Sequence, residues 1–393
     1  MSPNSKNEYT QAVAKRYKRA DIFKKSVILN EYCNVTGYHR KHAIRKLNNC
    51  TFFINRKLKK RGKPSRYNNQ DILIPLKKIW LTANLPCSKR LKVILPLWLP
   101  SYQKEFGYLP EYVLNALDSI SSPTIDRLLK PSRIKYKGRG RSTTKPGTLL
   151  RKHIPIKTNQ WDEFRPGFLE ADTVAHCGDT TDGIYANTID FVDIATCWTE
   201  QRAVWGKGEQ GVLKEIRNVE KDLPFPILGF DSDNGNEFLN WHLFRHFTQR
   251  KQPVQFTRSR AYHKDDNAHI EQKNWTHVRQ WLGYHRFDDP LIVPLMNELY
   301  TSEWRFYHNF FCPSTKLLEK KRVASKVIKK YDAPKTPFQR ILDSEYVNPK
   351  VKQKLKEQFD NLNPFQLRKA MELKINKIFK LTSKLKNTKP SYE

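Results

Sequence analysis

The sequence predicts a mixed α/β core, built on a five-stranded mixed sheet, with helical segments before and after it. Alternation of apolar and polar residues at a period of two indicates strands. Helical spacing between and after these runs indicates an order of three strands, helix, strand, helix, strand and helix. The strand-like runs lie at 168–176, 185–193, 197–205, 226–230 and 254–258. The expected segments are 1–55, 66–133, 134–153, 154–288 and 289–393.

The charge of the chain is strongly positive and unevenly spread. The net charge is +33 over 393 residues, and residues 1–160 hold about 35 Lys and Arg against about 8 Asp and Glu. A charge of this size indicates a polyanionic partner, and we expect double-stranded DNA. A ribosomal or histone-like protein would be as basic, but it would not need the acidic residues described below.

The first 55 residues have the pattern of a helix-turn-helix domain. Helical spacing over 21–33 is followed by a break at Gly37 and by a second, basic helix over 38–47. The second helix of this motif enters the major groove of DNA. A structural helical hairpin with a solvated basic face is the alternative. The residues expected to contact DNA are Arg40, Lys41 and Arg45.

Two basic stretches separate the segments that follow. Residues 56–66 are a charged run that could track DNA or serve as a solvated tether. Residues 66–133 return to helical spacing, and we expect a second helical DNA-binding unit there. The stretch 134–153 is rich in Gly, Lys and Arg without apolar periodicity, which is typical of a linker.

Three acids accompany the predicted core elements. Asp172 lies near the middle of the first strand, Asp233 follows the fourth strand in an Asp-Asn-Gly turn, and Glu271 lies on the last helix. Sites of open α/β sheets lie at the carboxyl ends of strands, although Asp-Asn-Gly is also an ordinary turn sequence. We predict that the three acids converge at one edge. The competing acids are Asp190, Asp193, Asp231, Asp265 and Asp266, with Asp231 ranked first.

These motifs resemble the catalytic core shared by retroviral integrases and bacterial DDE transposases, which has a ribonuclease H-like fold. The matching residues are Asp172, Asp233 in Asp-Asn-Gly-x-Glu-Phe, and Glu271 in Asp-Asn-Ala-x-Ile-Glu-x-x-Asn. The resemblance covers about residues 160–285. It implies that the three acids hold catalytic metal ions, and that cleavage at element ends precedes transfer of a 3′-hydroxyl into target DNA. The chain lacks an N-terminal zinc site of the retroviral kind, so it resembles the bacterial insertion-sequence branch.

The chemistry of phosphodiester exchange agrees with an acidic site. Charge develops at the entering and leaving oxygens, and two divalent cations about 4 Å apart can stabilise it. Hard cations prefer carboxylate and water oxygens over nitrogen or sulfur ligands. We therefore expect two Mg²⁺ or Mn²⁺ ions and no small-molecule cofactor.

Polar residues near Glu271 are expected to border the active edge and meet DNA. Asn267 precedes Glu271 by four residues, so both side chains share one face of the predicted helix. Each of the others could equally be an ordinary surface residue. The residues assigned to this rim are Tyr262, His263, Lys264, Asn267 and Lys273.

The six cysteines are scattered without Cys-x-x-Cys pairs, so we expect free thiols in a reducing compartment. No apolar run is long enough to cross a bilayer, and the first residues lack a signal-peptide pattern. The expected location is therefore the bacterial cytoplasm, on the chromosome and away from membranes.

After the core come an aromatic stretch at 299–311, a basic stretch at 316–330 and two amphipathic helices at 350–360 and 365–379. The aromatics could stack on a DNA end, but helical spacing is more typical of core residues. The two helices could dock on the core or on another protomer.

The expected protein is a metal-dependent DNA transposase or integrase that works as a homodimer or homotetramer on DNA. A DNA-binding regulator that no longer cuts is one alternative. A structure-selective nuclease that cuts without joining is another, and it would use the same acids.

Overall fold

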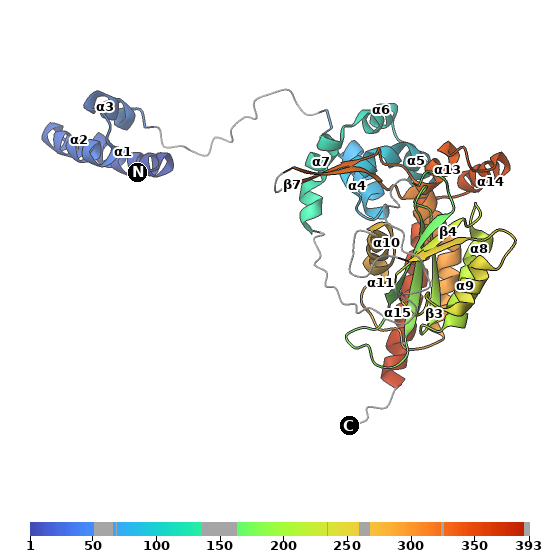
Figure 1. Ribbon diagram of the computed structural model, residues 1–393. Coiled ribbons are helices and arrows are strands. Elements are labelled where there is room, and N and C mark those ends of the chain that lie inside the picture. Colours follow the sequence, from blue (N-terminus) through green and yellow to red (C-terminus); the bar gives the residue numbers. More distant parts are fainter. Residues whose placement is uncertain are drawn as a thin grey trace. The chain divides into compact units, whose positions relative to one another are not determined.

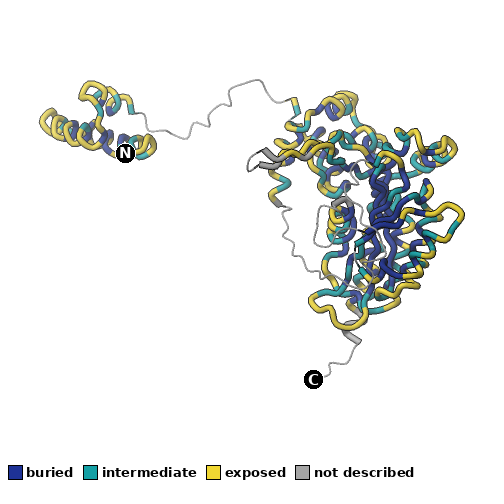
Figure 2. The backbone as a smooth tube through the Cα atoms, in the orientation of Figure 1, coloured by how far each residue is buried: buried dark blue, intermediate teal, exposed yellow. Residues whose placement is uncertain are grey.

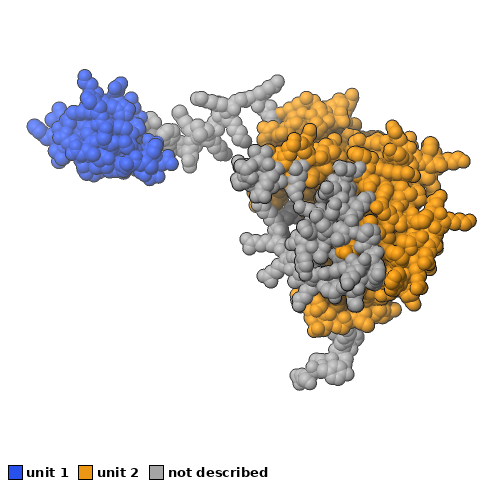
Figure 3. Space-filling model, in the orientation of Figure 1, with its two compact units in different colours: residues 1–65 blue, residues 66–393 orange. Residues whose placement is uncertain are grey.

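A computed structural model describes residues 1–50, 66–67, 69–135, 163–233, 235–258, 268–323 and 326–388. The chain divides into two compact units, residues 1–65 and 66–393, which Figure 3 shows in different colours.

The first unit contains three helices around a small apolar core. Helices α2 and α3 were expected from the sequence, whereas α1 was not. The Thr10 and Tyr32 hydroxyl groups hydrogen-bond at 2.6 Å and join α1 to α2 inside this core. The helices are α1 (Pro3–Arg19), α2 (Ile22–Thr36) and α3 (Arg40–Asn48). The buried apolar residues are Val13, Ala14, Tyr17, Ile28, Leu29, Tyr32, Ala43 and Leu47.

The turn between α2 and α3 depends on glycine. Gly37 has a φ of 69°, and its N–H donates to the carbonyl of Cys33 to end α2. A residue with a Cβ atom rarely adopts this left-handed conformation, so Gly is the suitable C-terminal cap. The predicted break at Gly37 between two helices is therefore confirmed.

The second unit begins with four helices that the sequence predicted in part. Helix α5 continues through Pro96 and Pro100. Both prolines lie on its exposed face, where water can satisfy the carbonyls they leave free, while Trp98 and Tyr102 keep the inner face buried. The helices are α4 (Gln70–Thr82), α5 (Ser88–Phe106), α6 (Glu111–Ser119) and α7 (Ser122–Lys135).

The sequence had suggested a separate helical unit at residues 66–133. In the structure these helices do not form one. Trp98 of α5 makes edge contacts with the rings of Tyr307, Phe311 and Phe365, which come from the C-terminal part of the chain. Its indole N–H donates to the Phe311 carbonyl at 3.3 Å. The four helices therefore share one hydrophobic core with the rest of residues 66–393.

The second unit contains a five-stranded mixed sheet in the order β3-β2-β1-β4-β5. Figure 1 shows its strands β3 and β4. β2 pairs antiparallel with β1 and β3, while β4 pairs parallel with β1 and β5. This confirms the predicted mixed α/β core and its five strands. The strands are β1 (Phe168–Ala175), β2 (Ala186–Asp193), β3 (Thr199–Trp205), β4 (Gly229–Ser232) and β5 (Gln255–Arg258).

Helices connect these strands as the sequence predicted. The helix between β4 and β5 begins only at Trp241, because Asn240 caps it: the Asn240 side chain accepts from the Leu243 N–H at 2.9 Å. The residues before this cap are thereby left free to form the turn that follows β4. The connecting helices are α8 (Glu209–Asp222) and α9 (Trp241–Thr248), and α10 (Ala268–Lys273) follows β5.

The C-terminal part of the chain packs onto the same core, and Figure 2 shows the buried interior of this unit. The aromatic stretch is buried, with Tyr300 and Trp304 fully inaccessible, so the interpretation as core is confirmed. The elements after α10 are η2 (Asn274–Arg279), α11 (Gln280–Leu282), α12 (Ile292–Leu299), η3 (Tyr300–Trp304), η4 (Tyr307–Phe311), β6 (Leu317–Val323), β7 (Lys326–Tyr331), α13 (Pro337–Asp343), α14 (Pro349–Asp360) and α15 (Pro364–Thr388).

The antiparallel hairpin of β6 and β7 was not expected, because its lysines had indicated only a basic stretch. Leu355 of α14 and Met371 of α15 are buried in the core of this same unit. Both helices therefore dock on their own chain. Among the described helices, none is long and apolar enough to cross a membrane.

Candidate active site

Asp172 lies on β1, and Asp233 follows the end of the neighbouring strand β4. β1 and β4 are parallel, and Ala171 is the register partner of Ser232. One residue further along each chain come the two acids, so their side chains leave the same side of the sheet, roughly 5 Å apart along the hydrogen-bonding direction. The sequence prediction that these two acids meet is therefore matched by the register of the sheet.

Hydrogen bonds hold the Asp172 carboxylate in place. Its Oδ1 accepts from the Thr173 backbone N–H at 2.7 Å, and its Oδ2 accepts from the Asn274 side-chain amide at 2.6 Å. The Asp233 carboxylate accepts from the Gly235 N–H at 3.0 Å. A Cβ atom at Gly235 would approach the Glu237 carboxylate to 2.6 Å, so glycine gives this turn room for two converging acids.

The two carboxyl groups oppose each other's ionisation. The surrounding protein raises the pKa of Asp172 by desolvation, and the neighbouring charge of Asp233 raises it further. Desolvation also raises the pKa of Asp233, followed by the charge of Glu237. Both residues are only half-buried, so a ligand can still reach them. Like charges held this close favour a bound cation.

Lys207 supplies part of the opposing charge. It follows β3, and its Nζ lies 2.7 Å from Glu237 Oε1, in an ion pair whose carboxylate is buried. The charge of Lys207 lowers the pKa of both Asp172 and Asp233, against the larger effect of desolvation. Glu237 thus holds a lysine beside the acid pair.

Glu271 lies on the helix that crosses this region. The Ile270 N–H donates to Glu170 Oε2 at 3.1 Å, and Asn274 donates to Asp172, so both ends of the segment are tied to β1. Residues three apart are neighbours on a helix surface, which places Glu271 beside Asn274. The Glu271 side chain is exposed.

A complete metal-binding trio is not assembled in the described part of the chain, where no three His, Cys, Asp or Glu side chains are grouped closely enough to hold an ion. Asp172 and Asp233 provide the oxygen ligands that Mg²⁺ and Mn²⁺ prefer. Desolvation and a neighbouring carboxylate raise the pKa of each of these two acids. The carboxylate oxygens of these two acids therefore fit a divalent cation. Glu271 lies about one helical turn from Asn274, which contacts Asp172.

Three of the competing acids have structural partners. Asp190 is the register partner of Asp172 and accepts from the Gln201 side-chain amide at 2.7 Å, and burial raises its pKa to about 8. Asp193 accepts from the backbone N–H groups of Gly167 and Thr196. Asp231, ranked first among the alternatives, is buried and accepts from the Thr257 hydroxyl. Asp265 and Asp266 lie outside the described residues.

The predicted rim is described only at Lys273. That residue was expected on the exposed border of the site, but it is 6% exposed. Lys273 follows Glu271 by two residues. Two residues span about 200° around a helix, so Lys273 lies on the opposite side of the helix from Glu271, where it lines a pocket. The other rim residues, which lie outside the described residues, are Tyr262, His263, Lys264 and Asn267.

In the first unit, the basic residues of α3 differ in their surroundings. Lys41 and Arg45 are exposed. Arg40 is exposed as well, but its guanidinium donates to the Asn30 side chain and, at 3.2 Å, to the Ser26 hydroxyl of α2. Arg40 therefore supports the packing of α3 on α2 besides offering charge to a partner.

Sequence reasoning missed two residues that shape the acid pair. Asn274 closes the Glu-x-x-Asn motif, so its position three residues after Glu271 was a usable signal. Lys207 stands in an ordinary Gly-Lys-Gly turn, and nothing near it in the sequence marks it out. Its role depends on Glu237, which is 30 residues away.

Taken together, fold and site define a mixed α/β protein whose central sheet carries two neighbouring carboxylates, Asp172 on β1 and Asp233 directly after the parallel strand β4. The chain is 34% identical over 348 residues to the uncharacterized protein y4rM of Sinorhizobium fredii, an alignment that spans 86% of this chain and 96% of that protein. The chain belongs to the same family as y4rM.

Two further comparisons concern protein-family models and solved structures. The scan against protein-family models gave no match. Among solved structures, the chain is similar to a chain of the simian T-cell lymphotropic virus intasome in complex with PP2A regulatory subunit B56 gamma. That similarity has 15% identity and a TM-score of 0.31, and it covers 61% of this chain and 73% of the viral-complex chain.

Proposed function

We propose that the protein is a DNA transposase or integrase with a ribonuclease H-like core. The observation that carries the proposal is the placement of Asp172 on β1 beside Asp233, which directly follows the parallel strand β4. Asn274 joins the segment that carries Glu271 to Asp172. The order of three antiparallel strands followed by two parallel ones supports the same fold.

The proposed ligands for two Mg²⁺ or Mn²⁺ ions are Asp172, Asp233 and Glu271. Ions bound there would stabilise negative charge on the entering and leaving oxygens of a phosphodiester. Within the protein, Asn274 orients Asp172, and Gly235 leaves the space in which Asp233 and Glu237 converge. Lys207 offers a positive charge to a phosphate that approaches the pair.

The proposed reaction has two steps on DNA. Water attacks the phosphodiester at an element end, the 3′-oxygen of the element strand leaves as a free 3′-hydroxyl, and the flanking strand keeps the 5′-phosphate. That hydroxyl then attacks a phosphodiester of target DNA in line, and a target 3′-oxygen leaves. Two ends have to be held together, so we propose a homodimer or homotetramer on DNA, acting at the bacterial chromosome in the cytoplasm.

Recognition of the element end is assigned to the first unit. Lys41 and Arg45 on α3 are exposed and positively charged, as a helix that enters the major groove requires. Charge in the N-terminal third would add affinity for any DNA sequence through phosphate contacts.

A joining assay tests the proposal. The protein is incubated with Mg²⁺, a labelled duplex that carries an element end and a plasmid target, and labelled plasmid is the expected product. Glu271→Gln keeps the size of the side chain but removes its charge, so we expect unchanged folding and DNA binding and at least about a 100-fold loss of joining. Glu345→Gln, at an exposed position of the C-terminal part, is the matched control and keeps full activity.

Other outcomes separate the alternatives. A structure-selective nuclease would produce cleaved duplex without joined plasmid. A regulator derived from a transposase would bind the duplex and produce neither. Undiminished joining by Glu271→Gln would refute the assignment of that residue.

A further inference from the structure

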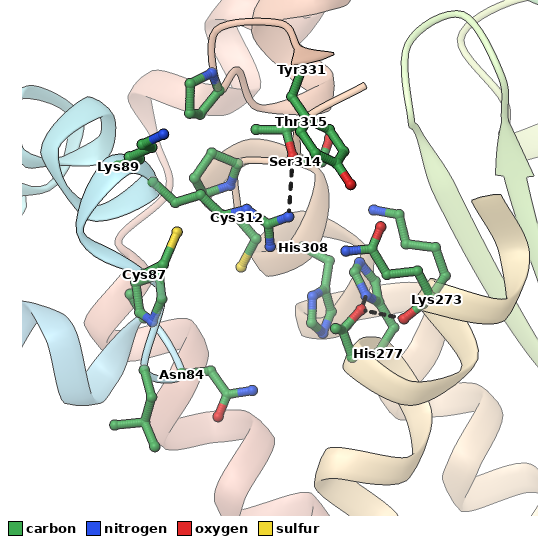
Figure 4. Close-up of a pocket in the computed structure, with 18 of the residues that line it drawn as sticks. Asn84, Cys87, Lys89, Lys273, His277, His308, Cys312, Ser314, Thr315 and Tyr331 are labelled. Atoms are coloured by element: carbon green, nitrogen blue, oxygen red, sulfur yellow. Dashed lines mark hydrogen bonds between the residues drawn. The ribbon is translucent and has the colours of Figure 1, made fainter. Parts of the chain in front are cut away.

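A second site lies on the other side of the α10–η2 segment. It is a pocket of ≈ 760 Å³ lined by the α4–α5 turn, the α10–η2 segment, η4 and β7. Cys87 and Lys89 lie across the pocket from Lys273 and His277 (Figure 4). Pockets that bind small organic groups have volumes of about 300–1,000 Å³, so this one has room for such a group.

The lining of this pocket is strongly basic. Asp332 is the lining acid, and it is already paired with Arg340, whose Nη1 lies 2.7 Å from the carboxylate. In the described part of the chain, no carboxylate forms an ion pair with Lys273, although Asp190 attracts it from further away. A negatively charged ligand would be favoured here. The lining cations are Lys89, Arg90, Lys273, Lys329 and Lys330.

A buried histidine faces the pocket with unmade hydrogen bonds. His308 is 3% exposed, and among the described residues neither of its ring nitrogens has a hydrogen-bond partner. Burial lowers the pKa of His308, so the ring is neutral and carries one donor and one acceptor. Buried polar atoms without partners are costly, and a ligand that offers a donor and an acceptor would satisfy both.

Flat rings complete the lining. The His277 and His308 rings stack with centroids 4.0 Å apart, and Tyr331 places a half-exposed ring at the β7 side. An aromatic base can stack on the Tyr331 ring while its edge makes hydrogen bonds. Opposite, Arg90 donates to the Thr315 hydroxyl at 3.4 Å, which keeps the guanidinium beside the pocket.

We propose that this pocket binds one unpaired nucleotide of a DNA strand, with its phosphate against the lysines and its base against the ring-bearing wall. The inference rests on the proposed function in that DNA is the partner. One helical segment connects the two sites: Asn274 contacts Asp172, whereas Lys273 and His277 line the pocket. A strand that passes the acid pair can therefore place a neighbouring nucleotide in the pocket.

The test follows a fluorescent base without any catalysis. A short duplex carries 2-aminopurine in a single-stranded overhang, and the full-length protein is added in EDTA. Stacking in the pocket quenches the fluorescence of the overhang base, and we expect the same base within the paired region to stay unchanged. Failure of the joining assay would leave this result untouched, because no metal ion or cleavage is involved.

Variants separate the pocket from general DNA affinity. Lys89→Gln combined with Lys330→Gln removes two exposed lining charges, and we expect about a tenfold weaker affinity for the overhang. Lys92→Gln combined with Lys356→Gln removes two exposed charges outside the pocket and should change that affinity less than twofold. His308→Phe keeps a ring without nitrogens, so it should lower quenching while the melting temperature is maintained or raised.

Three results would overturn the proposal. One is equal affinity for the overhang duplex and a blunt duplex. Another is an equal loss in the lining and the control pair. The third concerns competition for the overhang. If free deoxyadenosine monophosphate displaces the overhang at the same concentration as a single-stranded oligonucleotide does, the pocket binds a mononucleotide instead.

Discussion

At the level of single residues, the repulsion between Asp172 and Asp233 destabilises the folded protein locally. Asp172 and Asp233 are held side by side by strand register, and desolvation and mutual repulsion raise their pKa values. Lys207 offsets part of this charge. Two carboxylates that repel each other favour a bound cation. Without a metal ion, the protonation of these acids should control the stability of the protein.

The pH dependence of stability follows from the direction of these shifts. An acid with a raised pKa in the folded state keeps its proton where the unfolded chain has lost it, so stability falls as pH rises. For Asp190 the window runs from the ordinary value of 3.8 to about 8, and Asp172 and Asp233 add to the fall. Between pH 7 and pH 8 the buried His176, His277 and His308, whose pKa values burial lowers, are largely neutral in both the folded and the unfolded state. Denaturation of the metal-free protein should therefore show decreasing stability from pH 7 to pH 8.

Asp172→Asn tests the origin of this effect. Removing one of two repelling charges should stabilise the metal-free protein at pH 8 by on the order of 1 kcal/mol, which corresponds to roughly 2–4 °C in melting temperature for a large domain. Mg²⁺ should stabilise the unchanged protein but not this variant. A variant that melts lower than the unchanged protein at pH 8 would show that Asp172 mainly supports the fold.

The residues of the acid pair could be predicted because strand patterns and the Asp-Asn-Gly turn are local signals. The residues that change the pKa values of this pair could not be predicted from local patterns. Lys207 and Glu237 meet only after α8 and β4 have folded back on the sheet. The position of Lys273 was also missed, because rotation about a helix decides between rim and interior and depends on what the helix packs against.

At the scale of elements, the α10–η2 segment connects both sites. The Ile270 N–H and the Asn274 side chain tie it to Glu170 and Asp172 of β1. Those two hydrogen bonds fix which side of the helix faces the acids. The orientation of Glu271 therefore depends on contacts made by its neighbours.

Asn274→Ala should disturb this orientation without removing a proposed metal ligand. Hydrogen bonds to charged groups contribute about 1.5–3 kcal/mol, and the variant leaves Asp172 without one of its donors. We expect at least about a tenfold lower rate of joining at saturating DNA, with the affinity for DNA unchanged, as measured by single-turnover kinetics. A normal rate would show that the helix needs no anchor at this point.

Element types were more predictable than their lengths. Helix α5 continues through two prolines because a continuous buried face, including Trp98 and Tyr102, outweighs the local cost. The hairpin of β6 and β7 was missed because repeated lysines hid its weak alternation. In both places tertiary packing decided the outcome, and a local pattern contains little of that information.

At the scale of the whole molecule, the chain separates DNA recognition from chemistry in the proposed function. Residues 1–65 and 66–393 are distinct compact units, and each has its own hydrophobic core. The helices at 66–135 belong to the larger unit, which the sequence alone did not indicate because their contacts reach residues more than 200 positions away.

Removal of residues 1–65 should therefore leave a folded protein. We expect residues 66–393 to unfold cooperatively at nearly the melting temperature of that unit in the full chain, because their core does not include the first unit. The shortened chain should still respond to Mg²⁺ but lose its preference for element-end DNA in competition binding. Retention of that preference would place end recognition in the larger unit.

The proposed function requires that Asp172, Asp233 and Glu271 jointly bind divalent cations. Electron paramagnetic resonance of the free ion, recorded while the full-length protein is titrated with Mn²⁺, measures this binding. We expect specific binding that weakens at least about tenfold in Asp172→Asn, Asp233→Asn and Glu271→Gln, and that persists in Glu345→Gln. Equal Mn²⁺ binding by the unchanged protein and the three acid variants would contradict it.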